Sequence, residues 1–147
     1  MVGDIAGLAP GSGLLSLVTN ANGGIIDDTV ITNAGDFVYM VVNGATKFGD
    51  MKHFEEQMAA FGGDVTMEYL EDSMQLLAIQ GPGAADAVKK LLPSDFDLVK
   101  MPFMTGQNTT LDGVDGCRIT RYVREVLVPM VVVSNSCSPI GQLRIHW

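Results

Sequence analysis

Short apolar runs, separated by Gly, Asn and Asp, occupy the first third of the chain. They predict strands over residues 14–19, 25–32 and 37–43. The segments NANGG and NAGD that separate these runs have the composition of hairpin loops.

The period then changes from that of a strand to that of a helix, in the segment GDMKHFEEQMAAFGG. Its apolar residues recur every three or four positions and form a single stripe: Met51, Phe54, Met58 and Phe61. Asp50 is expected to cap the start of this helix, and Gly62 is expected to end it.

In the second half of the chain, predicted strands are again followed by a predicted helix. Strands are predicted over 64–70 and 74–80, a helix over QGPGAADAVKKLL, and a further strand at GVDGCRITRY. We interpret SDFDLVKMPFM, which precedes that last strand, as a loop or short strand. The order βββαββαβ predicts an α+β fold: an antiparallel-rich sheet with helices packed on one face.

Composition narrows the function classes. A chain of 147 residues suits one compact domain, and its net charge of −8 disfavours nucleic-acid binding. Two cysteines are too few for a disulfide framework, so free thiols are expected. No segment reaches the roughly 20 apolar residues of a membrane helix, and no targeting segment is recognised at the N-terminus.

Motifs for metal, redox or nucleotide chemistry have little support. The sequence contains no HxxxH, HExxH or CxxC motif, and His53 is expected to be a half-exposed helix residue. QGPGAA superficially resembles a phosphate loop, but a tight turn between strand and helix explains it better, because the GxGxxG spacing and the GK[ST] ending are absent.

Two adjacent carboxylates interrupt the apolar strand IIDDTVIT. Asp is disfavoured in strand interiors, and neighbouring side chains of a strand point to opposite faces. Either Asp27 faces water while Asp28 caps a turn or meets an arginine, or the pair serves as a general base, an electrostatic stabiliser or a metal ligand. The residues of this segment alone leave both interpretations open.

Several segments, in order, resemble the aminomethyltransferase (T protein) family of the glycine cleavage system. They are VGDIAGLAPGSGLLSLVTNANGGIIDDTVIT, MVVNGATKFGDM, LLAIQGPGAADAVKKLL, KMPFMTG and GVDGCRITR. Together they cover about residues 2–121. NGGIIDD and LLAIQGP are typical of the wider folate-binding family, whereas GCRITR is closer to the T protein, particularly its eukaryotic form.

The resemblance implies a reaction and a site. T proteins take an aminomethyl group from the lipoyl arm of H protein, release ammonia and pass the one-carbon unit to tetrahydrofolate, their co-substrate. Asp28 matches the family's main catalytic residue, and Asp27 would lie on the opposite face. Asn43 matches a residue that contacts the pterin ring, and Phe103 lies near an aromatic that lines the folate. No metal, nucleic-acid or membrane partner is expected. The similarity of these segments to eukaryotic T proteins implies a mitochondrial location.

The resemblance also has limits along the chain. An FDVSHM-like segment comes before the matching part in the family, and CGYTGEDGFE follows CRITR, where this chain reads YVREVLVPMVVV. Charge changes close to this point: residues 1–117 hold sixteen acids and five lysines, and 118–147 hold four arginines and one glutamate. We therefore predict a partial folate-binding aminomethyltransferase domain over 1–121 and a divergent tail outside the family fold over 122–147.

Two further interpretations of function stay open for such a partial domain. One is a non-catalytic folate-binding scaffold like the iron–sulfur assembly branch, although the KGC-type motif of that branch is absent. The other is an inert or interaction-only remnant in which the apolar stretch 126–133 is an exposed pairing edge.

Overall fold

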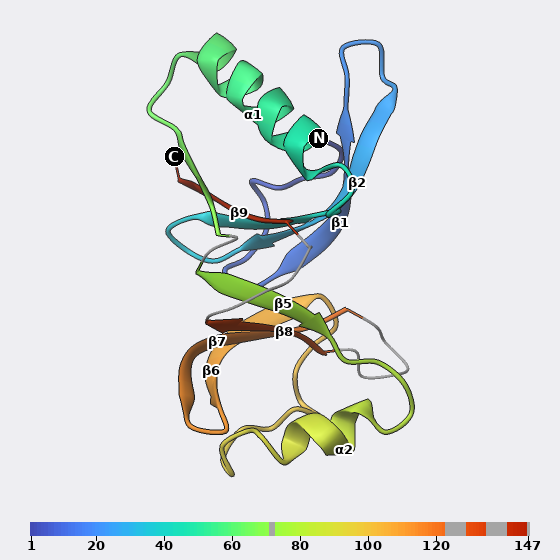
Figure 1. The fold of residues 1–147 in the computed structure, drawn as a ribbon, viewed down its shortest axis with the longest axis vertical. Coiled ribbons are helices and arrows are strands. Elements are labelled where there is room, and N and C mark those ends of the chain that lie inside the picture. The colour runs from blue at the N-terminus through green and yellow to red at the C-terminus, as the bar shows by residue number, and fades with distance from the viewer. Residues whose placement is uncertain (71–72, 123–128, 135–140, 147) are drawn as a thin grey trace. The chain divides into compact units, whose positions relative to one another are not determined.

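The computed structural model describes residues 1–70, 73–122, 129–134 and 141–146 (Figure 1). The chain forms two compact units rather than the single domain that its length favours. The first comprises Met1–Glu71 with Pro139–Trp147, and the second comprises Asp72–Ser138.

A five-stranded antiparallel sheet forms the first unit, in the order β1-β2-β3-β9-β4. Its strands are β1 (Gly13–Thr19), β2 (Ile25–Asn33), β3 (Val38–Val42), β4 (Thr66–Tyr69) and β9 (Gly141–His146). The four strands that precede residue 71 agree with the predicted segments.

Both predicted hairpin loops are present. In the first, the side-chain oxygen of Asn20 accepts the backbone N–H groups of Asn22 and Gly24 at 3.0 and 2.9 Å. In the second, the side-chain oxygen of Asn33 accepts the N–H of Gly35 at 2.9 Å. Such side-chain-to-backbone bonds are the reason that Asn favours turns.

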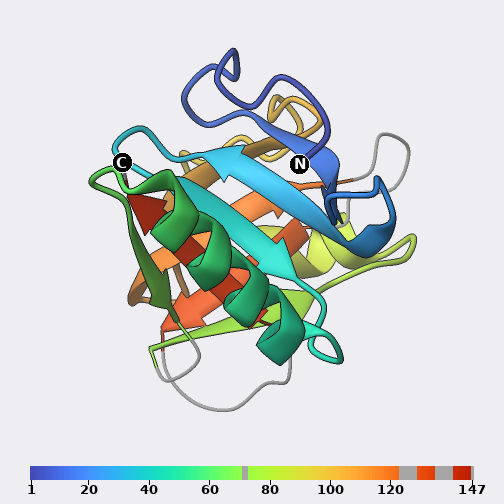
Figure 2. The ribbon, with the colours of Figure 1, turned by 90° about the horizontal axis from the view of Figure 1, so that it is seen from above.

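Helix α1 (Lys47–Phe61) covers one face of this sheet (Figure 2). Phe54 is the buried anchor of the predicted stripe, with Met51 and Met58 half-buried beside it. Phe54 packs against a core from the strands: Val18, Ile31, Val38, Met40 and Val42.

The ends of α1 only partly match the sequence prediction. Gly62 ends the helix as predicted, in the left-handed conformation (φ 67°) and with its N–H bonded to the Met58 carbonyl. The prediction that Asp50 caps the helix was wrong, because α1 begins three residues earlier and Asp50 is completely buried within its first turn. Phe61 also departs from the stripe, since its side chain is 73% exposed.

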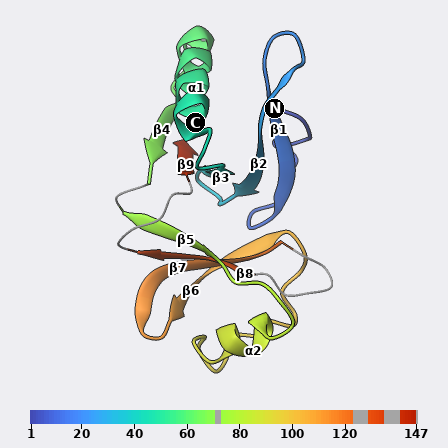
Figure 3. The ribbon, with the colours of Figure 1, turned by 45° about the vertical axis from the view of Figure 1, so that its right-hand side comes forward.

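The second unit holds a four-stranded antiparallel sheet in the order β5-β8-β7-β6 (Figure 3). Its strands are β5 (Met74–Ala78), β6 (Thr105–Leu111), β7 (Val114–Arg121) and β8 (Pro129–Ser134). Helix α2 (Ala84–Lys89) and the segment after it pack on this sheet through a buried cluster: Val88, Leu92, Leu98, Met101, Leu111, Cys117 and Ile119.

The antiparallel, helix-poor architecture agrees with the α+β prediction, but the described residues form two sheets, each with one helix packed on it. Strand β6 was not predicted, because TGQNTTL lacks apolar alternation. Two strands come from the predicted tail, where β8 pairs with β5 and β7, and β9 pairs with β3 and β4. Residues 129–134 are therefore not the exposed edge that the remnant interpretation required, and residues 126–128 of that stretch lie outside the described part of the chain. The 121/122 boundary of the family fold stays a prediction.

Among the described residues, no helix is long and apolar enough to cross a membrane.

We expect Phe54→Ala to destabilise the protein by about 3–5 kcal/mol, because it removes a buried aromatic and leaves a cavity between α1 and the sheet. Phe61→Ala, on the same helix, is the matched control. Its free energy of unfolding should stay within about 0.5 kcal/mol of the unsubstituted protein. Urea denaturation followed by circular dichroism measures both, and equal losses in the two variants would contradict the packing described here.

Candidate functional site

Asp28 and Asn43 meet at one end of the first sheet. The β2–β3 pairing places Val30 opposite Val41, and the same register continued by two residues places Asn43 opposite Asp28. Asn43 directly follows β3, where the chain leaves the sheet for α1. The two residues that the sequence predicted for this site are therefore adjacent.

The side-chain amide of Asn43 bridges both carboxylates of the IIDD segment. Its Nδ2 atom lies 2.8 Å from Asp27 Oδ1 and 2.9 Å from Asp28 Oδ1. An amide NH₂ group has two protons, so it donates one hydrogen bond to each carboxylate. Asp28 itself is exposed, whereas Asp27 is only 7% exposed.

Asp27 is held by further donors. Its Oδ2 atom accepts the backbone N–H of Asn43 at 3.1 Å and the hydroxyl of Thr46 at 2.9 Å. Burial raises the pKa of Asp27, but hydrogen bonds from the Asn43 side chain and backbone, from Thr46 and from Asp50 outweigh it. The net pKa lies below the usual 3.8, so the carboxylate stays ionised.

Asp50 is the second buried carboxyl of this group. Neither of its oxygens accepts a hydrogen bond from the N–H and O–H groups of the described residues. Burial is the main cause that raises the pKa of Asp50; the nearby Thr46 hydroxyl lowers it and the charge of Asp27 raises it, for a net pKa of about 6. The oxygen of the Thr46 hydroxyl lies 2.9 Å from Asp27 Oδ2 and 3.1 Å from the Asn43 carbonyl oxygen, so these two acceptors compete for its single proton and neither Asp50 oxygen receives it. A protonated Asp50 can itself donate a hydrogen bond to Asp27.

The arrangement can stabilise a cation. Asp28 is an exposed carboxylate whose orientation is fixed on one side by a neutral donor, which suits electrostatic stabilisation of positive charge. Across the described ranges, no group of three or more His, Cys, Asp or Glu side chains is placed to hold a metal ion.

Phe103 belongs to the second unit, where it precedes β6 and is 40% exposed. The residues of the first unit that surround Asp28 therefore do not include it. Its predicted place beside the folate stays a prediction.

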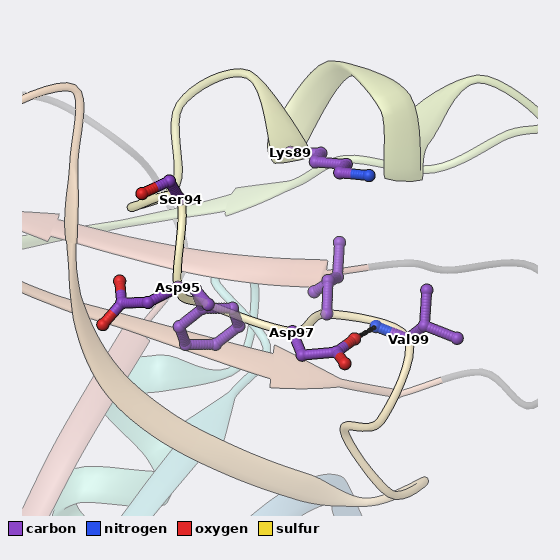
Figure 4. A pocket seen from close by; sticks show the side chains of 7 residues that line it. Lys89, Ser94, Asp95, Asp97 and Val99 are labelled. Carbon is purple, nitrogen blue, oxygen red and sulfur yellow. Dashed lines mark hydrogen bonds between the residues drawn. The ribbon is translucent and has the colours of Figure 1, made fainter.

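The second unit also contains a cavity of about 330 Å³ beside α2 (Figure 4). Except for Lys89, its lining comes from the segment 94–99. The Asp97 carboxylate accepts the backbone N–H groups of Val99 and Lys100 at 3.2 and 3.3 Å, so its own loop engages it. None of the predicted site residues lines this cavity.

Sequence reasoning missed the buried half of the Asp28 site. Asp27 was placed on the face opposite Asp28, which agrees with its burial, but its contact with Asn43 was not foreseen. Asp50 was assigned to a helix cap, and Thr46 was not considered. One signal was available for Asp50: it lies four residues before Phe54, the central residue of the apolar stripe, and residues four apart share a helix face.

Comparison with known proteins identifies the family of this chain. Residues 1–125 match the GCVT N-terminal domain. The chain is 48% identical over 127 residues to the mitochondrial aminomethyltransferase of Mesembryanthemum crystallinum. It is 43% identical over 126 residues to that of Dictyostelium discoideum, and 41% identical over 125 residues to that of Homo sapiens.

Each alignment covers 82% of this chain and 30% of the relative. The chain thus spans about a third of the length of these relatives. The match includes Asp27 and Asp28 on β2 and Asn43 directly after β3, and the chain belongs to the GCVT N-terminal domain family.

Proposed function

We propose that this chain is part of an aminomethyltransferase of the glycine cleavage system. The reaction moves a one-carbon unit from the aminomethyl-lipoyl arm of H protein to tetrahydrofolate and releases ammonia. The observation that carries the proposal is the 48% identity over 127 residues to a mitochondrial aminomethyltransferase. A mitochondrial location, H protein as partner and tetrahydrofolate as co-substrate belong to the same proposal.

Asp28 is the catalytic residue in this proposal. When a folate nitrogen forms a bond to the transferred carbon, positive charge develops on that nitrogen, and when ammonia leaves that carbon an iminium cation forms. The exposed Asp28 carboxylate, oriented by Asn43, stabilises this charge electrostatically. Because the carboxylate is positioned before the substrate arrives, it needs little reorganisation during the reaction.

Asn43 contributes an acceptor to the same site. Both protons of its amide are committed to the carboxylates of Asp27 and Asp28, so its carbonyl oxygen Oδ1 is the group left for a ligand. A pterin ring carries N–H donors that such an oxygen can accept. This geometry supports the proposed contact between Asn43 and the pterin.

The proposed folate site also includes a residue of the second unit. Phe103 is proposed to line the folate with its exposed ring, and the whole fold is proposed to be part of the folate-binding aminomethyltransferase fold. The scaffold alternative is not favoured, because the relatives named above are all aminomethyltransferases.

Asp28→Asn is expected to weaken tetrahydrofolate binding by about 10-fold, because it replaces a charged hydrogen-bond acceptor of the proposed folate site by a neutral amide. Where H protein supplies the aminomethyl group, turnover should fall by at least about 100-fold. Calorimetric titration gives the affinity, and release of ammonia gives the rate.

Asp36→Asn is the matched control for this experiment. Asp36 is an exposed aspartate in the loop between β2 and β3, so its substitution should leave both quantities unchanged. The proposed function is contradicted if the unsubstituted protein shows no saturable tetrahydrofolate binding, or if Asp28→Asn binds as tightly as Asp36→Asn.

A further inference from the structure

The buried carboxylate of Asp27 has no direct access to a ligand, yet it is the most heavily hydrogen-bonded group near Asp28. Both of its oxygens are occupied: Oδ1 by the Asn43 amide, and Oδ2 by the Asn43 backbone N–H and the Thr46 hydroxyl. All of these donors lie in the short connection between β3 and α1. Asp27 thus fixes that connection to the end of β2.

The contacts with Asp27 also decide which way the Asn43 amide points. Were the amide turned over, its oxygen would lie 2.8 Å from Asp27 Oδ1 and 2.9 Å from Asp28 Oδ1, where acceptors would oppose acceptors. Asp28 alone sets this orientation weakly, because it is exposed and water competes for its oxygens. Asp27 sets the orientation of the amide strongly. If the Asn43 amide turned over, the buried, ionised carboxylate of Asp27 would lose a hydrogen-bond donor, which costs free energy.

We propose that Asp27 is a positioning residue that orients the Asn43 amide and, through it, the carboxylate of Asp28. Asp27 acts on the reaction only through Asn43 and touches no substrate. The consequence for folate binding rests on the proposed function, whereas the orientation of Asn43 does not.

Asp50 and Thr46 complete the support beneath Asp27. Thr46 bonds to Asp27 Oδ2, and Asp50, four residues further along and wholly buried, lies against the same carboxylate. The charged and titratable groups that act on Asp50 are Asp27 from β2 and His53 from the next turn of α1. Two adjacent buried carboxyls are best accommodated when one of them keeps its proton.

Nuclear magnetic resonance tests the orientation without any ligand. In protein labelled with ¹⁵N-asparagine, Asp27→Ala should move the Asn43 side-chain NH₂ signals to the positions of a solvated amide and speed their exchange with water. The Asn33 amide, which donates to the Leu8 carbonyl at 2.7 Å in the same unit, is an internal control that should not move. Asp36→Ala should leave both amides unchanged.

Asp27→Asn is the second variant, in case Asp27→Ala fails to fold. Its neutral amide oxygen accepts more weakly from the Asn43 amide, and its own NH₂ would oppose the donors at Oδ2, so the Asn43 signals should shift in the same direction as in Asp27→Ala but by less. Asn43 signals that stay at their original positions in a folded Asp27 variant would overturn the proposal.

A double-mutant cycle tests whether Asp27 acts through Asn43. We expect Asp27→Ala to weaken tetrahydrofolate binding by about 10-fold in the unsubstituted protein, and to have no further effect in an Asn43→Ala background. Equal effects in both backgrounds would overturn the proposal. Absence of tetrahydrofolate binding to the unsubstituted protein would instead refute the proposed function, and the amide signals would still decide the role of Asp27.

The proton on Asp50 gives a pH-dependent prediction. The pKa of Asp50 is about 6 in the folded protein and 3.8 in the unfolded chain, so the folded state keeps a proton that the unfolded chain has released. Stability from this group is therefore lost as the pH rises toward 7. Relative to Asp50→Asn, which mimics the neutral carboxyl, the folding equilibrium constant should fall by about 10-fold between pH 5 and pH 7.

Urea denaturation of both proteins at the two pH values measures this difference. The lowered pKa of Asp27 does not interfere, because its contribution is lost only below its usual pKa of 3.8. A difference between the two proteins that is the same at pH 5 and pH 7 would show that Asp50 carries no such proton.

Discussion

The antiparallel register of β2 with β3 is the constraint on which the candidate site depends. It fixes which residue of the β3–α1 connection stands opposite each aspartate of the IIDD segment. A shift by one residue would turn every side chain of β2 to the other face, burying Asp28 and exposing Asp27. The buried apolar residues Ile31 and Met40, which pair across the two strands, prevent that shift.

The polar residues at this end of the sheet orient one another in sequence. Asp28 is exposed and is oriented by Asn43, and Asn43 is oriented by the buried Asp27. Asp27 in turn contacts Thr46, which directly precedes α1, and Asp50 in the first turn of α1. The packing of Phe54 holds α1 against the sheet. An exposed carboxylate thus gains a defined direction from Asn43, which the buried Asp27 holds in place, and a fixed direction is what electrostatic stabilisation requires.

Much of the first unit was predictable because its signals are local. The strands before residue 71, the Asn- and Gly-containing hairpins and the glycine that ends α1 follow from periodicity and turn chemistry over a few residues. The failures lie where local signals are weak. The polar strand β6 has no alternation, and Asp50 sits in a position that is typical of a cap but belongs to a helix that begins at Lys47.

The sequence by itself determined the family resemblance and the antiparallel α+β class, and it predicted Asp28 and Asn43 for one site, since these inferences rest on residue types and their order. Only the tertiary structure decided the role of Asp27. Whether an aspartate in a strand meets water or a set of donors depends on what covers its face of the sheet, and the start of α1 covers Asp27. The burial of Asp50 and the places of β8 and β9 inside their sheets were decided in the same way, because strand order and burial arise from contacts between segments far apart in the chain.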